Sequence, residues 1–271
     1  MKKTIRTKRF VQGVLVLACV LYGSDGIAAA VQLDAATVSK NEGAVAQIPQ
    51  LSQSGNRLSG DESMWGVLGK PAEPILNLIN ASPLMVSELS DYRDAVNAHT
   101  ALPFGDLKED WSGAKMLVLP DGIKQIVISS DVVAASPGEL VGDLSHGLSY
   151  FRNYDNDRRL YDALVGKLPP DDPKYRMMIG FVGVGMTARA EVNNYIIQQQ
   201  ILARTATETG GAVTIKLAND KNSKGLLQST LDNVYAPDRA QGVPPEQDTA
   251  KLEKAAFVIT RSIPIPRRSA Q

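Results

Sequence analysis

The chain has 271 residues, and its 29 lysines and arginines balance its 29 aspartates and glutamates. This length is enough for one large domain, or for one domain with tails. Beyond the first nine residues the sequence has no block of basic residues except the pair Arg267-Arg268, so nucleic acid is not an expected partner.

The N-terminus is typical of a secretory signal peptide. Five basic residues between Lys2 and Arg9 precede an uncharged, mostly apolar run over 10–22, and the small residues Ala28-Ala29-Ala30 follow. The apolar run is too short to span a bilayer. We therefore expect cleavage after Ala30, which gives a periplasmic or secreted protein with no integral membrane span. A retained N-terminal anchor and a lipoprotein cut before Cys19 are the alternatives.

Removal of residues 1–30 changes the charge and the redox chemistry of the chain. It takes away five basic residues and one acid, Asp25, which leaves 24 basic and 28 acidic residues and a formal charge of −4. It also removes Cys19, the only cysteine. The mature chain is then expected to contain neither disulfides nor thiolate metal ligands.

The mature part divides into three regions by composition. Residues 31–64 are small, polar and without sustained periodicity, which predicts a flexible N-terminal arm. Residues 65–235 carry the helix-like and strand-like patterns of an α+β domain, and 236–271 form a proline-rich link and a C-terminal segment.

Helical spacing begins near Pro71. A second helix is predicted from Ser82, a capping residue followed by Pro83 at the first helical position, to about His99. Two apolar runs then follow, Met116–Leu119 and Ile123–Ser129. The turn residues Pro120-Asp121-Gly122 join them, which predicts a β-hairpin.

The clearest helix start is Ser136-Pro137-Gly138-Glu139, a capping box with proline at the first helical position. A long polar stretch from Asn153 is predicted to be mainly a loop, with some helical potential around 160–165, and a long helix should run from about 173 to 204. A short strand at 213–217 and a helix around 224–234 follow. Four carboxylates of the polar stretch are expected to be solvated, with a weak Ca²⁺ site as the alternative: Asp155, Asp157, Asp171 and Asp172.

One motif carries chemistry. In the HExxH motif of zinc peptidases, two histidines four residues apart bind the metal, and the glutamate between them acts as general base. The stretch Gly142-Asp143-Leu144-Ser145-His146 resembles this motif, with His146 at the position of the second histidine. Glu191 lies on the next long helix, where the resemblance implies a third ligand. Over about 115–205 the chain therefore resembles a zincin-like metallopeptidase.

The departures from the motif decide the expected activity. Gly142 has no ligating side chain, and Asp143, at the general-base position, is one methylene shorter than glutamate. The remaining ligands, His146 and Glu191, are one short of the usual three. His99, the only other histidine, could complete a mixed site with Asp143.

We therefore expect a helix-rich α+β fold, with a zincin-like helix pair and a small β-hairpin or sheet. The expected function is non-catalytic binding of a protein or cell-wall peptide in the envelope, without a cofactor, or with zinc if the site is functional. One alternative is an active metal-dependent hydrolase that uses His146, Glu191 and one of His99 or Asp143. Another is a structural or interaction protein of an envelope assembly, in which His146 is simply a buried, hydrogen-bonded histidine. Nothing in the sequence indicates an oligomeric state.

Overall fold

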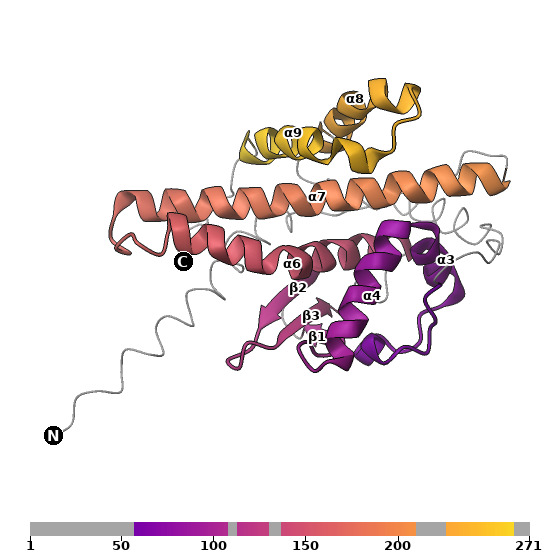
Figure 1. The fold of residues 1–271 in the computed structure, drawn as a ribbon, viewed down its shortest axis with the longest axis horizontal. Coiled ribbons are helices and arrows are strands. Elements are labelled where there is room, and N and C mark those ends of the chain that lie inside the picture. The colour runs from indigo at the N-terminus through magenta and orange to yellow at the C-terminus, as the bar shows by residue number, and fades with distance from the viewer. Residues whose placement is uncertain (1–56, 108–112, 130–136, 210–225, 263–271) are drawn as a thin grey trace, which may run out of the picture.

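The structure is a computed structural model that describes residues 57–107, 113–129, 137–209 and 226–262. Two long helices that run side by side dominate it, α6 (Pro137–Leu164) and α7 (Pro173–Thr209) (Figure 1). A small sheet and the N-terminal helices lie on one side of this pair, and two C-terminal helices lie on the other. The predicted helix-rich α+β fold is confirmed. The expected signal peptide and the strand at 213–217 fall outside the described residues.

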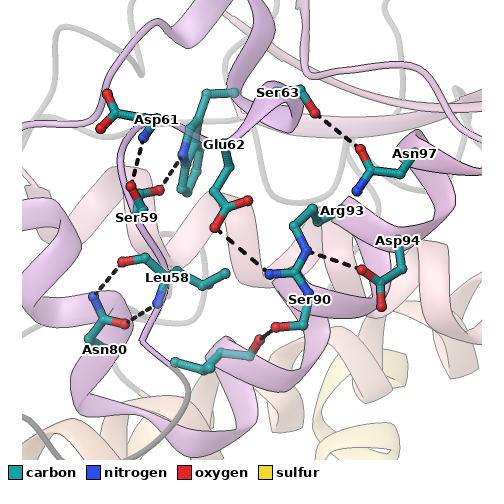
Figure 2. Close-up of polar contacts among 12 residues, drawn as sticks. Leu58, Ser59, Asp61, Glu62, Ser63, Asn80, Ser90, Arg93, Asp94 and Asn97 are labelled. Carbon is teal, nitrogen blue, oxygen red and sulfur yellow. Dashed lines mark hydrogen bonds and ion pairs between the residues drawn. The ribbon is translucent and has the colours of Figure 1, made fainter.

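Three elements precede the sheet: η1 (Ser63–Leu68), α3 (Glu73–Ala81) and α4 (Pro83–Asn97). The segment before them docks on α3 through a pair of hydrogen bonds (Figure 2). The N–H of Leu58 donates to Asn80 Oδ1 at 2.9 Å, and Asn80 Nδ2 donates to the Leu58 carbonyl at 3.2 Å. Leu58 is buried, and the buried Trp65 donates its indole N–H to the Ser59 carbonyl. Residues 57–64 of the expected flexible arm are therefore docked on the domain.

Helix α4 begins as its sequence predicts. The Ser82 side chain accepts the N–H of Met85 at 3.2 Å, and Pro83 occupies the first helical position. Gln200 of α7 reinforces this start, because its Oε1 accepts the N–H of Leu84 at 3.0 Å and the hydroxyl of Ser82. The cap thus also ties α4 to α7.

The sheet consists of β1 (Gly105–Leu107), β2 (Ala114–Val118) and β3 (Lys124–Ser129), in the order β1-β3-β2. β2 and β3 pair antiparallel, so the predicted hairpin is confirmed. Its turn places Gly122 at φ 86°, where a residue without Cβ is favoured. β1, which the sequence did not predict, pairs parallel with β3.

Tyr92 of α4 joins the helices to the sheet. Its ring is fully buried, 4.7 Å from the ring of Phe104 and 4.9 Å from that of Phe151. Its hydroxyl donates to the Leu102 carbonyl at 2.6 Å and accepts the N–H of Ile126 at 3.1 Å. One phenol therefore satisfies two backbone groups in the core.

Gly147 sets the approach of α6 to the sheet. A Cβ at this position would lie 2.8 Å from Cγ2 of Ile126 and 3.5 Å from Cβ of Ala114. Since real Cβ contacts are longer than the first of these distances, only glycine lets the helix lie this close. The same turn of α6 carries His146.

The predicted loop after Asn153 is wrong, because α6 continues without a break to Leu164. Its polar side chains pair along the helix and with α7: Arg158 and Asp162, four residues apart, are 3.0 Å from each other, and Asp157 pairs with Arg189. Asp157 is only 5% exposed, so the expectation of four solvated loop carboxylates is wrong for this residue.

Three elements follow α7: α8 (Leu226–Ala240), η2 (Pro245–Asp248) and α9 (Thr249–Ser262). The segment predicted to be a proline-rich link thus starts inside α8 and continues through two more helical elements. α7 contributes Ile197 and Ile201 to a core shared with the N-terminal helices, the sheet and α6. It contributes Val192 and Tyr195 to a second core shared with α8 and α9. Within the described ranges no helix has the length and apolar character needed to cross a membrane.

Candidate functional site

The interface between α6 and α7 places His146 opposite Glu191. The ring Nε2 of His146 lies 3.6 Å from Glu191 Oε2 and 3.1 Å from the side-chain amide nitrogen of Asn194. Both His146 and Glu191 are at least nine-tenths buried. The two residues that the sequence singles out from separate helices therefore meet.

Helical spacing explains the grouping. Asp143 and His146 are three residues apart on α6, and Glu191 and Asn194 are three residues apart on α7, so each pair lies on one face of its helix. Packing these two faces against each other brings the four side chains into one buried polar layer. Asn194 was not predicted, although its spacing from Glu191 would have placed it on the same face.

The charges around the ring favour its protonated form. Burial alone would lower the pKa of His146, but the negative charge of Glu191, a polar contact with it and the charge of Asp143 raise the pKa above 6.5. The separation of 3.6 Å is an ion-pair distance, slightly beyond a hydrogen bond. Glu191 Oε2 has no hydrogen-bond partner among the described residues. The positive charge of the protonated His146 ring therefore compensates the buried negative charge of Glu191.

A second polar cluster joins the same helices to α4. Asn193 Nδ2 donates to Glu88 Oε2 at 3.0 Å and to the Ser145 carbonyl at 3.1 Å. Arg152 approaches the other oxygen of Glu88 to 3.5 Å. Glu88 is 3% exposed, and burial raises its pKa to about 7, although the hydrogen bond from Asn193 and the charge of Arg152 lower it.

No local pattern could reveal this second cluster. Glu88 precedes Asn193 by 105 residues and Arg152 by 64. Its position in an apolar helix face is the one available indication, since a carboxylate among core residues needs a partner.

The remaining predicted site residues lie at different places. Gly142 is buried in α6 and contributes no side chain, and Asp143 lies beside His146. His99 is exposed at the end of α4, with φ 58°. Within the described parts of the chain, no three His, Cys, Asp or Glu side chains are grouped as metal ligands would be. The structure therefore does not bring His99 into the layer of His146 and Glu191.

A catalytic zinc needs three protein ligands and one open position. The buried Glu191 Oε2, which lacks a hydrogen-bond partner among described residues, and His146 Nε2 supply two donors. Asn194 directs its amide toward the same ring nitrogen, and Gly142 supplies nothing. These residues do not fit a catalytic zinc, so no hydrolytic step is derived from them.

Comparison with known proteins gives no family assignment: no family model, no curated protein and no solved structure matches the chain. The zincin-like resemblance therefore depends on the residues of this chain alone.

Proposed function

We propose that this chain is an exported, non-catalytic zincin-like protein that binds a protein or cell-wall peptide in the cell envelope. One observation carries the proposal: His146 of α6 faces Glu191 of α7 at 3.6 Å, as the second and third ligands of the motif would. A Cα separation of these two residues well beyond about 10 Å would have contradicted the resemblance.

The loss of catalysis follows from the side chains at this helix pair. The first histidine position is Gly142, and the general-base position has the shorter Asp143. Asn194 and Glu191 close the layer around His146, which is 9% exposed. A water molecule and a scissile peptide bond would both need access to this point. The layer is better suited to hold the two helices in register.

The edge of the sheet supports a peptide as the ligand. β2 is an edge strand, and among the described strands only β3 pairs with it. Ala114 of β2 lies next to Gly147, one residue after His146. An extended peptide can add to such an edge through main-chain hydrogen bonds, with side-chain pockets supplying selectivity. Binding would then take place beside the motif helix without chemistry.

Export is supported by the first 30 residues, in which a basic start, an apolar run and Ala28-Ala29-Ala30 follow one another. Expression of the full chain in a bacterial host and mass analysis of the periplasmic product test this part. A product that begins at Val31 is expected. An uncleaved chain in the cytoplasm would contradict export.

Metal content tests the loss of the site. The exported chain, purified without a histidine tag, should contain well below about 0.1 zinc per chain. Rebuilding the motif with Gly142→His and Asp143→Glu should bring the content to about one zinc per chain, because three ligands would then converge. Glu191→Gln in the rebuilt chain is the matched control and should lower it again.

Three outcomes separate the possibilities. About one zinc in the natural chain, lost on His146→Ala, would show a working metal site and overturn the non-catalytic proposal. A folded, rebuilt chain without zinc would overturn the zincin-like relationship. If the rebuilt chain does not fold, Asp143→His provides a second arrangement, with histidines three residues apart on one helix face.

A further inference from the structure

α9 holds a carboxylate in its contact with α7. Figure 1 shows α7 between α6 on one side and α9 on the other. The rings of Phe181 on α7 and Phe257 on α9 are in edge contact at 5.2 Å. Glu253 precedes Phe257 by four residues, so both lie on the side of α9 that is turned toward α7. Glu253 is half-buried there, and it is the only acid of α9.

Arg189 of α7 is the cation at this contact. Its side chain is 25% exposed, and Nη2 forms an ion pair with Oδ1 of Asp157 on α6. Its Nη1 lies 3.9 Å from the point that a Cβ of Gly185 would occupy. Gly185 is one helical turn after Phe181, so the guanidinium lies back along α7, toward the turn that contacts α9.

Asp157 is a second carboxylate that depends on the same arginine. It is 5% exposed, and its Oδ2 has no hydrogen-bond partner among the residues that the structure describes. The charge of Glu253 acts on both Asp157 and Arg189. Two carboxylates from different helices therefore share one guanidinium, and the cluster has a net charge of −1 when both are ionised.

The neighbouring charged groups do not balance this excess. Arg158, next to Asp157, pairs with Asp162 at 3.0 Å. Lys254, next to Glu253, is exposed on the side of α9 opposite its buried residues. The ion pairs of α8, η2 and the start of α9 are formed among themselves: Asp232 with Arg239, and Asp238 and Asp248 with Lys251. Among the described residues, one cation is thus left for the two carboxylates.

Burial sets the direction in which this cluster responds to pH. It raises the pKa of Asp157 from 3.8 to about 6, although Arg189 lowers it, and the charge of Glu253 raises it further. Burial also raises the pKa of Glu253, against the charge of Arg189. A raised pKa means that the packed state binds the proton more tightly than an opened state. The contact is therefore tightest below about pH 4 and weakens as the pH rises through 6.

We propose that Asp157, Arg189 and Glu253 form a pH-sensitive latch that holds α9 on α7 in mildly acidic surroundings and loosens it at higher pH. With one carboxyl protonated, Arg189 balances the other, and the cluster is neutral. With both ionised, the uncompensated buried charge is relieved when α9 moves away and Glu253 reaches water.

The latch controls access to an apolar surface. Ala188 and Val192 of α7 pack against α8 and α9 in the second core, next to Arg189 in the sequence. Movement of α9 would expose this part of α7 at higher pH and cover it again in acid. The titrating groups are Asp157 and Glu253, and neither contacts His146, so the inference is independent of the proposed function.

A thiol probe measures movement of α9. Ala256 is fully buried on α9, and Ala256→Cys in a full chain that also has Cys19→Ser places the only thiol there. This thiol reacts with a maleimide only when α9 leaves α7. At each pH its rate is divided by that of a short peptide with the same cysteine, which removes the effect of thiol ionisation.

The carboxyl variants give the specific prediction. The relative rate should rise roughly tenfold or more from pH 5 to pH 8. Glu253→Gln keeps the size of the side chain without its charge, so the rate at pH 8 should fall to near the value at pH 5. Asp157→Asn should also lower it, because Arg189 then balances Glu253 alone. Asp106→Asn, at an exposed position on β1, is the matched control and should leave the profile unchanged.

A second probe separates the latch from unfolding of the whole domain. Ala81→Cys lies in the core shared with the N-terminal helices and should react more slowly than Ala256→Cys at pH 8. Equal rates of the two probes would overturn the proposal, because the chain would then open as a whole. A relative rate that is constant with pH, or a rise that persists in Glu253→Gln, would also overturn it. Ala188→Cys, on the α7 side of the same contact, serves if Ala256→Cys does not fold.

Discussion

Glu88 should make the stability of this protein depend on pH between about 4.5 and 7. Its carboxyl is buried between α4, α6 and α7, and burial raises its pKa from 4.5 to about 7. A raised pKa means that the folded state binds this proton more tightly than the unfolded chain. The contribution to stability is therefore complete below about pH 4.5 and is lost as the pH rises through 7.

The structure gives the size of the effect. A rise in pKa from 4.5 to about 7 corresponds to about 3 kcal/mol between the two limits. Glu88→Gln mimics the protonated carboxyl, keeps the size of the side chain and retains an oxygen that can accept from Asn193. We expect it to match the natural chain near pH 4.5 and to exceed its unfolding free energy by up to about 3 kcal/mol at pH 8.

Urea unfolding followed by far-ultraviolet circular dichroism, on both full chains at half-unit steps of pH, measures this difference. Other titrating groups occur in both chains, so the difference curve isolates Glu88. A difference that stays flat with pH would refute the reasoning. A variant less stable than the natural chain at pH 8 would also do so, because it would show that Arg152 and Asn193 stabilise the ionised form more than burial disfavours it.

Three further predictions concern single side chains. Gly147→Ala should lower the unfolding free energy by about 1–3 kcal/mol, because the new Cβ would lie 2.8 Å from a side chain of β3. Gly185→Ala should raise the unfolding free energy by up to about 1 kcal/mol, because its new Cβ would lie 3.9 Å from the nearest atom, in the side chain of Arg189. Tyr92→Phe should cost about 2–3 kcal/mol in the same urea assay, since two backbone groups lose their partner. The pKa of His146, followed by NMR, should lie above 6.5 and should fall in the Glu191→Gln variant, where burial outweighs the remaining charge.

Each of these has a clear contrary result. Equal effects of the two glycine substitutions would mean that α6 does not approach the sheet as described. A loss below about 0.5 kcal/mol for Tyr92→Phe would mean that water replaces the phenol. A His146 pKa that does not respond to Glu191→Gln would show that the ion pair is not formed.

Local chemistry made part of the fold predictable. Ser82 and Pro83 mark the start of α4, and the turn at Gly122 marks the hairpin, because caps and turns depend on neighbouring residues only. The continuation of α6 was not predictable in this way. Its polar second half reads as a loop until Asp157 is seen to pair with Arg189, 32 residues further along the chain.

The same division applies to the candidate site. The resemblance to the zinc-peptidase motif selected His146 and Glu191, and the structure places their side chains 3.6 Å apart. Glu88 and Asn193 could not be selected, since their contact depends on how α4 crosses α7. A sequence pattern identifies the face of a helix, whereas the partner of that face is fixed only by packing.

The shared role of α7 has a consequence for local opening. Among the described elements, only α7 contributes buried residues to both apolar cores. α8 and α9 can therefore detach as a unit and expose only the second core, while α7 cannot unravel without breaking both. In native-state hydrogen exchange, the amides of α8 and α9 should share one opening free energy, and those in the middle of α7 should exchange only through global unfolding.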